Sequence, residues 1–185
     1  MNISELNIPG VFEIRPKIFS DKRGYFFESY NSSKFSLNKL DFTFIQDNQS
    51  FSTRGTVRGL HYQLNYPQGK LVSVARGAVM DVAVDIRIGS PTFGQHVSKV
   101  LDDKGNFRVY VPPGFAHGFI VLSENAIFQY KCTEQYHPED EYGLRWDDIE
   151  LGINWGDGPK IISDKDRNFK PLKEINSKFL PKYEK

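Results

Sequence analysis

Short apolar segments, each ended by a turn signal, run through most of this 185-residue chain. The turn signals recur at spacings of roughly 8–12 residues and include Gly89-Ser90-Pro91, Asp102 to Asn106 and Ser123-Glu124-Asn125. This pattern favours a sandwich, jelly roll or closed barrel over a parallel sheet. An aromatic content of 14% with few helix-favouring runs also indicates β architecture. The length suits one domain, residues 1–185, with one sizeable core.

Local patterns predict the early elements. Val11 to Arg15 alternates as a strand, and the polar turn at residues 20–24 leads into an aromatic strand at residues 25–30, which predicts a hairpin. A short peripheral helix is expected over Asn31 to Leu40. Its cap would be Asn31 or Ser32, and its buried side chains Phe35, Leu37 and Leu40. A long β-rich stretch follows at residues 71–87, broken at Gly77.

Three segments each allow two interpretations. Residues 46–50 are compatible with a turn or with a hydrogen-bonding wall. Asp81 and Asp85 share one face of a strand, which is either a wet face or a face on which Asp81 points into a barrel and orients a histidine. Residues 144–155 form a loop or a short helical lid. The charged cluster at residues 163–167, taken alone, is expected to face solvent.

Charge and cysteine content exclude several functions. The net charge of +1 comes from interspersed charges, so the basic stripe that nucleic acids require is absent. No apolar run approaches the length of a membrane span, and no secretory leader is apparent, so we expect a cytoplasmic protein without a membrane partner. Cys132 is the single cysteine, which rules out an internal disulfide and predicts a buried structural thiol.

The chemistry of the chain is concentrated between Arg58 and Lys70. This stretch holds one imidazole, two cations, three side-chain amides and two phenols. A lone histidine such as His61 is more often a satisfied core residue than a catalytic one. Here Arg58 and Lys70 make that interpretation weaker, because three ionisable groups on one sheet face are costly without a ligand. The stretch therefore predicts a small-molecule site.

The spacing in this stretch is similar to the metal-binding pattern of cupin barrels, His-x-His, Glu and Gly. The corresponding residues here are His61, Gln63, Lys70 and Gly77. The second cupin motif, Pro-x-Gly-x-x-His, is intact as Pro112, Gly114 and His117. Two of four expected ligands are missing, and an ammonium in place of the carboxylate would repel a divalent ion. We therefore expect an all-β cupin jelly roll (double-stranded β-helix) with short peripheral helices and neither metal nor cofactor.

Seven ordered motifs resemble the dTDP-4-dehydrorhamnose 3,5-epimerase family along nearly the whole chain. They are Phe26-Phe27-Glu28-Ser29, Gln46-Asp47-Asn48, Arg58-Gly59-Leu60-His61, Gln68 to Val72, Asp81 to Asp85, Gly114 to Phe119 and Ser163-Asp164-Lys165-Asp166. The resemblance implies a metal-free homodimer that inverts carbons 3 and 5 of dTDP-4-dehydro-6-deoxy-D-glucose. The product, dTDP-4-dehydro-L-rhamnose, would serve dTDP-L-rhamnose synthesis for cell-surface polysaccharides.

The resemblance also implies roles for individual residues. By motif position, His61 would be the general base, Asp166 its carboxylate partner, Tyr136 the general acid, and Lys70 the cation beside the keto oxygen. Tyr136 rests on the family match alone, because the chain has nine tyrosines. For His117, a structural role and direct contact with the substrate are equally compatible with the sequence. The substrate-binding residues implied are Arg23, Phe26, Glu28, Gln46, Asn48, Arg58, His117 and Tyr130.

The reaction explains why these residue types are needed. Hydrogens on carbons 3 and 5 lie beside the ketone of carbon 4, so removing either gives an enolate whose charge must be stabilised by a cation or donor. An imidazole held by a carboxylate is a usable base at neutral pH. Inversion requires a donor on the opposite face, for which a phenol suffices. Arginine forks such as Arg23 and Arg58 suit a diphosphate.

Other functions, both enzymatic and non-enzymatic, are compatible with the sequence. The chain could be a 3-epimerase only, or a ketoisomerase on a related nucleotide 4-keto sugar. It could also be a non-catalytic sugar-nucleotide-binding cupin, which would not need His61, Asp166 and Tyr136 together. A two-fold dimer, in which the aromatic hairpin around Phe26 packs against the partner, is also expected, because the aromatic residues there exceed what a small barrel can bury alone.

Overall fold

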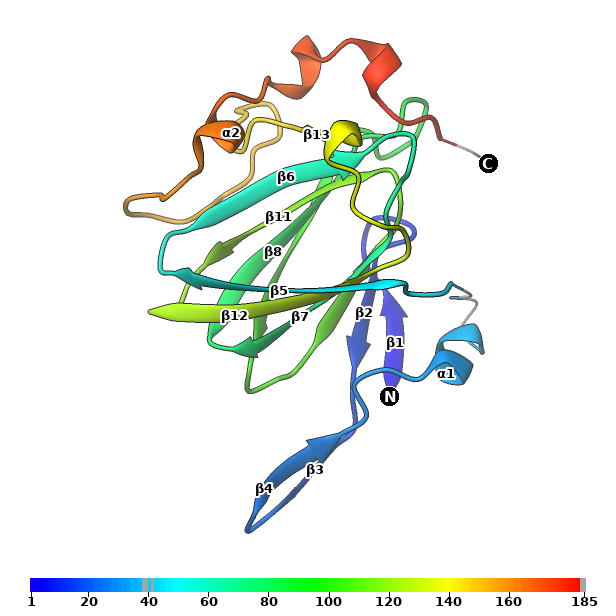
Figure 1. The fold of residues 1–185 in the computed structure, drawn as a ribbon, viewed down its shortest axis with the longest axis vertical. Coiled ribbons are helices and arrows are strands. Elements are labelled where there is room, and N and C mark those ends of the chain that lie inside the picture. Colours follow the sequence, from blue (N-terminus) through cyan, green and yellow to red (C-terminus); the bar gives the residue numbers. More distant parts are fainter. Residues whose placement is uncertain (38–39, 41, 184–185) are drawn as a thin grey trace.

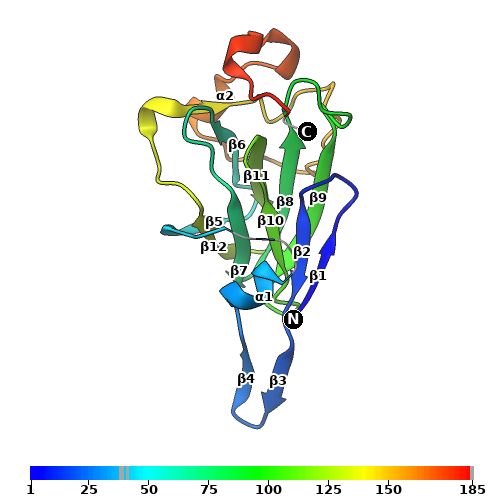
Figure 2. The same cartoon turned by 90° about the vertical axis from the view of Figure 1, so that its right-hand side faces the viewer.

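Two antiparallel sheets face each other in the computed structural model, which describes residues 1–37, 40 and 42–183 (Figures 1 and 2). The six-stranded sheet has the order β1 (Asn2–Glu5), β2 (Phe12–Arg15), β10 (Arg108–Val111), β7 (Lys70–Arg76), β12 (Asn125–Cys132) and β5 (Gln46–Thr53). The five-stranded sheet has the order β13 (Glu141–Gly143), β6 (Val57–Gln63), β11 (Phe115–Val121), β8 (Ala78–Asp85) and β9 (His96–Asp102). The all-β prediction is confirmed.

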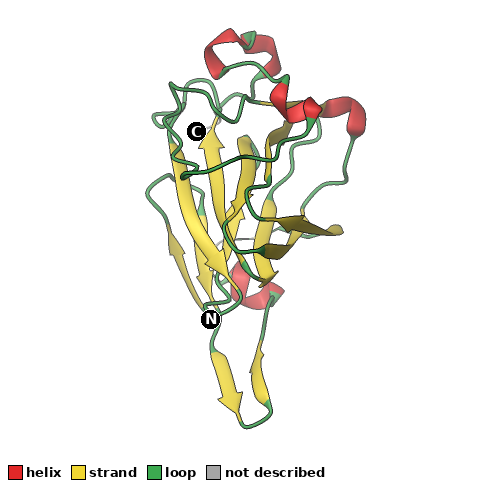
Figure 3. Ribbon diagram, turned by 90° about the vertical axis from the view of Figure 1, so that its left-hand side faces the viewer, coloured by secondary structure: helices red, strands yellow, loops and turns green. Residues whose placement is uncertain are grey.

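Helices are short and peripheral (Figure 3). They are α1 (Ser32–Ser36), α2 (Asp164–Arg167) and three 3-10 helices, Pro138–Asp140, Leu172–Glu174 and Ser177–Phe179. None of the helices in the described ranges has the length and apolar character needed to cross a membrane.

The period of two along each strand separates the core into layers. On β8, Val79 and Ala83 point between the sheets, where they join Phe128 and other apolar side chains in the main core. Val82 and Val84 point the other way, toward a second cluster that the segment from Leu144 to Leu180 covers. Asp81 and Asp85 share the inward face of β8 and are only 2% and 0% exposed, so the wet-face interpretation is wrong.

An irregular pairing between β6 and β11 sets the position of two ionisable side chains. Arg58 and His61 are three residues apart, which in a regular strand would place them on opposite faces. Their partners on β11, Phe119 and His117, are only two residues apart, and the register shifts between them. β6 therefore carries one extra residue, and Arg58 and His61 both line the interior.

Gly59 makes this irregular pairing possible. It has a positive φ of 117°, and a Cβ on it would lie 2.6 Å from Gly118 Cα and 2.7 Å from the His117 carbonyl oxygen. Only a glycine allows β6 and β11 to approach this closely in that backbone conformation.

A two-stranded hairpin extends away from the sheets (Figure 1). It pairs β3 (Ile18–Asp21) with β4 (Gly24–Phe27), so the predicted hairpin exists but has different strands. β2 pairs with β1 and β10 instead, and the aromatic strand ends at Phe27 rather than continuing to residue 30. Phe26 is 71% exposed on this hairpin.

The structure decides three other predictions. The helix is shorter than expected: Asn31 caps it and Phe35 and Leu40 are buried, but Leu37, at the cap after its last turn, is 84% exposed. Residues 38 and 39 of the predicted helix lie outside the described residues. Residues 46–50 belong to strand β5, so the turn interpretation is wrong. Residues 144–155 form a loop, as one of the two interpretations expected. The helical-lid interpretation is wrong, because Leu151 and Trp155 pack on the second cluster.

The role of Gly59 can be tested against Gly89, which also has a positive φ but has open space around it. Gly89→Ala should cost about 1–2 kcal/mol from backbone strain alone, whereas Gly59→Ala should cost about 3 kcal/mol or more because of the added overlap with β11. Denaturant unfolding at one protein concentration measures both. Equal losses for the two variants would contradict the close-approach argument.

Candidate active site

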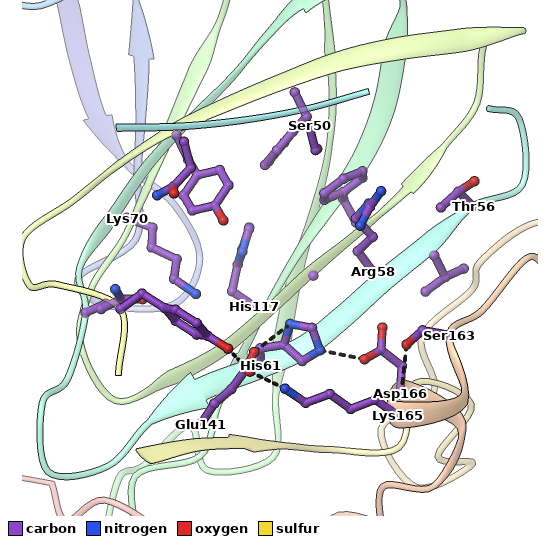
Figure 4. A pocket seen from close by; sticks show the side chains of 18 of the residues that line it. Ser50, Thr56, Arg58, His61, Lys70, His117, Glu141, Ser163, Lys165 and Asp166 are labelled. Carbon is purple, nitrogen blue, oxygen red and sulfur yellow. Dashed lines mark hydrogen bonds and ion pairs between the residues drawn. The ribbon is translucent and has the colours of Figure 1, made fainter. Parts of the chain in front are cut away.

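A cavity of about 710 Å³ opens between the two sheets (Figure 4). Strands β5, β7 and β12 supply one wall, β6 and β11 the other, and β13 and α2 close one end. The cavity is lined by charged and polar side chains as well as aromatic ones. They include Gln46, Asn48, Ser50, Arg58, His61, Lys70, His117, Phe119, Phe128, Tyr130, Cys132, Tyr136, Glu141, Lys165 and Asp166.

His61 and Asp166 form a hydrogen-bonded pair. His61 Nε2 lies 2.7 Å from Asp166 Oδ1, and the backbone N–H of Gly59 donates to Asp166 Oδ2 at 3.2 Å. Burial raises the pKa of Asp166, but the bonds from His61 and Gly59 outweigh it and hold the carboxyl below its ordinary value. Asp166 is only 4% exposed, so the expectation that its cluster faces solvent is wrong for this residue. The Ser163 side chain caps α2 by accepting a hydrogen bond from the backbone N–H of Asp166.

Glu141 joins three groups beside the pair and was not expected from the sequence. One carboxylate oxygen lies 3.5 Å from His61 Nδ1, and the other accepts hydrogen bonds from the Tyr136 hydroxyl, at 2.6 Å, and from Lys165 Nζ. Burial raises the pKa of Glu141, and the bonds from Lys165 and Tyr136 lower it to a net value below the ordinary one. The bond to Glu141 raises the pKa of Tyr136 to about 12.

The pairing of β13 with β6 explains why Glu141 and Lys165 escaped sequence analysis. Glu141 stands in the acidic run of residues 139–141, which resembles a solvated loop, and Gly143 lies directly opposite His61 only in the folded sheet. Lys165 belongs to the motif at residues 163–166, and that match is the one signal that could have selected it.

Lys70 lies at the end of the cavity formed by the six-stranded sheet, opposite Cys132 on the neighbouring strand. Burial lowers the pKa of Lys70, and the nearby Cys132, Glu141 and Asp81 counter this only in part. Cys132 is buried, as predicted. Burial raises its thiol pKa, and Lys70 opposes that shift.

His117 also faces the cavity, and its Nε2 lies 2.7 Å from Asp81 Oδ2. The interpretation that Asp81 points inward and orients a histidine is therefore confirmed. Both side chains are buried, so this pair fixes the His117 imidazole in the cavity wall. His117 lies directly opposite His61 in the pairing of β11 with β6.

Arg23, Phe26 and Glu28 are not brought to this cavity. Arg23 lies on the hairpin turn, where its guanidinium pairs with Asp21 at 2.7 Å. Glu28 follows β4 and pairs with Lys34 at 2.7 Å. The chain thus separates these three implied binding residues from Gln46, Asn48, Arg58, His117 and Tyr130, which all line the cavity.

At the positions where cupins carry metal ligands, this chain has side chains that bind other protein groups. The Gln63 amide donates to the carbonyl oxygens of Tyr66 and Gln135, at 2.7 and 3.0 Å, and accepts from His137 N at 2.9 Å. In the described part of the chain, no group of three or more His, Cys, Asp or Glu side chains is arranged to hold a metal ion.

Comparison with known proteins shows which family has this architecture and cavity. Residues 5–174 match the family described as dTDP-4-dehydrorhamnose 3,5-epimerase. The chain belongs to this family. A dTDP-4-dehydrorhamnose 3,5-epimerase from Pseudomonas aeruginosa is 49% identical over 179 residues, which cover 95% of this chain and 98% of the relative.

Solved structures of two sugar epimerases, a 3,5-epimerase and a 3'-monoepimerase, extend the comparison. The dTDP-6-deoxy-D-glucose-3,5-epimerase of Legionella pneumophila, in complex with dTDP-4-keto-L-rhamnose, has a TM-score of 0.96 and 47% identity and covers 100% of this chain and 99% of its own. A double mutant of a 3'-monoepimerase from Streptomyces bikiniensis, in complex with dTDP, has a TM-score of 0.91 and 35% identity, covering 97% and 92%. The cupin jelly-roll prediction is confirmed by these epimerase folds.

The Asp166 pair should make stability depend on pH. Because its folded pKa lies below the ordinary value near 4, the ionised carboxylate stabilises the fold above about pH 4, and this contribution is lost as the pH falls through the folded pKa. Asp166→Asn should therefore be less stable than the parent at pH 7 by about 1–3 kcal/mol. The gap should narrow below about pH 4.

Urea unfolding at several pH values measures the gap, and Asp164→Asn is the matched control, since Asp164 lies on the same helix with an exposed side chain. A gap for Asp166→Asn that is the same at every pH would mean that its carboxylate charge contributes nothing.

Proposed function

We propose that this epimerase inverts carbons 3 and 5 of dTDP-4-dehydro-6-deoxy-D-glucose to give dTDP-4-dehydro-L-rhamnose. The observation that carries the proposal is the His61–Asp166 pair, which opens into a cavity that also holds Lys70 and two phenols. The family match and the Legionella complex with dTDP-4-keto-L-rhamnose support the substrate class. Participation in cell-surface polysaccharide synthesis and a cytoplasmic location stay predictions.

His61 acts as the general base in this proposal. Asp166 accepts a hydrogen bond from the N–H of Nε2, which fixes the neutral tautomer and leaves the lone pair of Nδ1 to remove a proton. Once the imidazole is charged, Asp166 on one side and Glu141, 3.5 Å from Nδ1, stabilise it. The same base serves both carbons in turn, because each lies next to the ketone.

Lys70 stabilises the enolate in this scheme. Its ammonium faces the cavity from the opposite sheet, where burial away from water strengthens its attraction to a developing oxyanion. Burial lowers the pKa of Lys70, so its proton is more easily shared with the enolate oxygen than the proton of an exposed lysine.

Two phenols compete for the role of proton donor. Tyr136 is the residue named by motif position, but its hydroxyl donates to Glu141, which lies on the side of His61. Tyr130 projects from β12, across the cavity from β6, and among the described residues its hydroxyl has no hydrogen-bond partner. Burial raises the pKa of Tyr130, which keeps this hydroxyl protonated. Inversion needs base and donor on opposite faces, which favours Tyr130.

The Streptomyces relative offers a comparison of the sequence separation between a histidine and a tyrosine. Its double mutant replaces a histidine and a tyrosine whose numbers differ by 70. Here His61 precedes Tyr130 by 69 positions and Tyr136 by 75. This correspondence supports Tyr130 as the donor that works with His61.

Proton NMR in heavy water separates base from donor. His61→Asn should abolish both inversion and deuterium uptake, with a loss on the order of 10²–10⁴-fold. Tyr130→Phe should retain deuterium uptake with retained configuration while inversion falls, because the base still forms the enolate. Tyr136→Phe should still invert. The reverse pattern for the two tyrosines would return the donor role to Tyr136.

The same spectra test the alternative of a 3-epimerase. The Streptomyces 3'-monoepimerase shares this fold, so the fold alone does not set how many carbons react. The parent enzyme should place deuterium at both carbons 3 and 5. Deuterium at carbon 3 only would establish the 3-epimerase instead.

We further propose a homodimer in which the hairpin of one chain completes the cavity of the other. Arg23, Phe26 and Glu28 lie outside the cavity of their own chain, and Phe26 is largely exposed on a hairpin that extends from the sheets. A second copy gives this aromatic surface a partner and brings Arg23 to a diphosphate.

Mixed dimers test the shared site. Arg23→Ala and His61→Asn homodimers should both be defective. A purified dimer with one chain of each kind should regain about half of the parental activity, since one of its two sites would combine an intact His61 with an intact partner hairpin. If each hairpin served its own chain, both sites of the mixed dimer would carry one defect and activity would stay low.

A further inference from the structure

Ser50 carries an unexplained polar group in the cavity wall. Among the described residues, two buried side-chain polar atoms lack a hydrogen-bond partner, Ser50 Oγ and Arg108 Nε. Only the first belongs to a residue that lines the cavity. Buried hydroxyls are nearly always paired, because an unpaired one loses its bonds to water without replacement. An orphan in a binding cavity therefore indicates a group that pairs with the ligand.

The polar side chains next to Ser50 on the same face of β5 all have hydrogen-bond partners. Alternation along the strand places Gln46, Asn48, Ser50 and Ser52 on one face. Gln46 Nε2 donates to Asn48 Oδ1 at 2.9 Å, and Ser52 Oγ accepts from Arg58 Nε at 3.0 Å. Ser50 lies between these two pairs and joins neither.

The packing around Ser50 gives no structural reason for a hydroxyl. Its direct partner across the strand pair is Phe128, whose ring stacks on Phe119 at a centroid distance of 4.1 Å. In such surroundings an alanine would pack equally well and would bury no unpaired polar atom. The hydroxyl therefore has a use only when the cavity is filled.

Arg58 indicates what fills this part of the cavity. Ser52 holds its Nε, and within the described ranges its two terminal nitrogens bind no other residue, so they are available to an anion. In Figure 4, Ser50 and Arg58 lie away from the end of the cavity occupied by Glu141 and Lys165. A diphosphate placed against Arg58 would bring acceptor oxygens to the stretch of β5 that contains Ser50.

We infer that Ser50 is a substrate-binding residue whose hydroxyl turns about its Cα–Cβ bond and donates a hydrogen bond to the nucleotide diphosphate beside Arg58. This inference rests on the proposed function, since it assumes a nucleoside diphosphate sugar as substrate. It also predicts that Ser50 contributes to binding without contributing to the stability of the free protein.

Calorimetric titration of the full-length protein with dTDP and with thymidine tests the inference. Ser50→Ala should bind dTDP about 10-fold more weakly or worse, and should bind thymidine as the parent does. In turnover assays KM should rise while kcat is retained, because the diphosphate is held equally in ground and transition states. The melting temperature without ligand should equal or exceed that of the parent.

Ser73→Ala is the matched control. Ser73 is a buried serine on β7 outside the cavity, and its hydroxyl donates to the Gln129 carbonyl oxygen at 3.4 Å, so its loss should leave dTDP affinity unchanged. Unaltered dTDP affinity in Ser50→Ala, or an equal loss for dTDP and thymidine, would overturn the assignment to the diphosphate. A parent protein that binds no dTDP would instead refute the proposed function on which the assignment rests.

Discussion

The close approach of β6 and β11 at Gly59 and Gly118 is the constraint on which the site depends. Without a Cβ at either position, the two strands can pair across one extra residue in β6. That extra residue turns Arg58 to the same face as His61, so a guanidinium and an imidazole share one cavity. The same backbone also donates the Gly59 N–H to Asp166, which links the strand to α2.

The interior of the fold has to reconcile an apolar core with a charged cavity. Toward one end, Val72, Val79 and Leu101 pack between the sheets, and toward the other the inward positions hold ionisable groups. Most of these charges have partners within the chain, as in the pairs His61–Asp166 and His117–Asp81. Within the described part of the chain, Lys70 and the terminal nitrogens of Arg58 have no hydrogen-bond or ion-pair partner, which is the arrangement expected where an anionic ligand supplies the missing charge.

Local pattern in the chain indicated most of the strands because alternation and turn residues act over short distances. The break at Gly77 separates β7 and β8, and the turn at residues 102–106 separates β9 from β10, both as expected. Predictions that depended on what a segment packs against were less successful. Leu37 was expected inside and lies outside, and the segment at residues 144–155 covers a sheet rather than a site. Neither outcome is decided by residues adjacent in sequence.

By itself the sequence determined the fold class, the family and the chemical character of the cavity, because motif residues such as His61, Lys70 and Asp166 can be recognised wherever the chain places them. Only the tertiary structure decided which of them meet. It brought the unexpected Glu141 beside His61, turned Asp166 inward from a charged helix, and kept Arg23 on a hairpin outside its own cavity. The physical reason is that distances between side chains are set by strand register, a bulge and the packing of remote segments, which no local spacing in the sequence specifies.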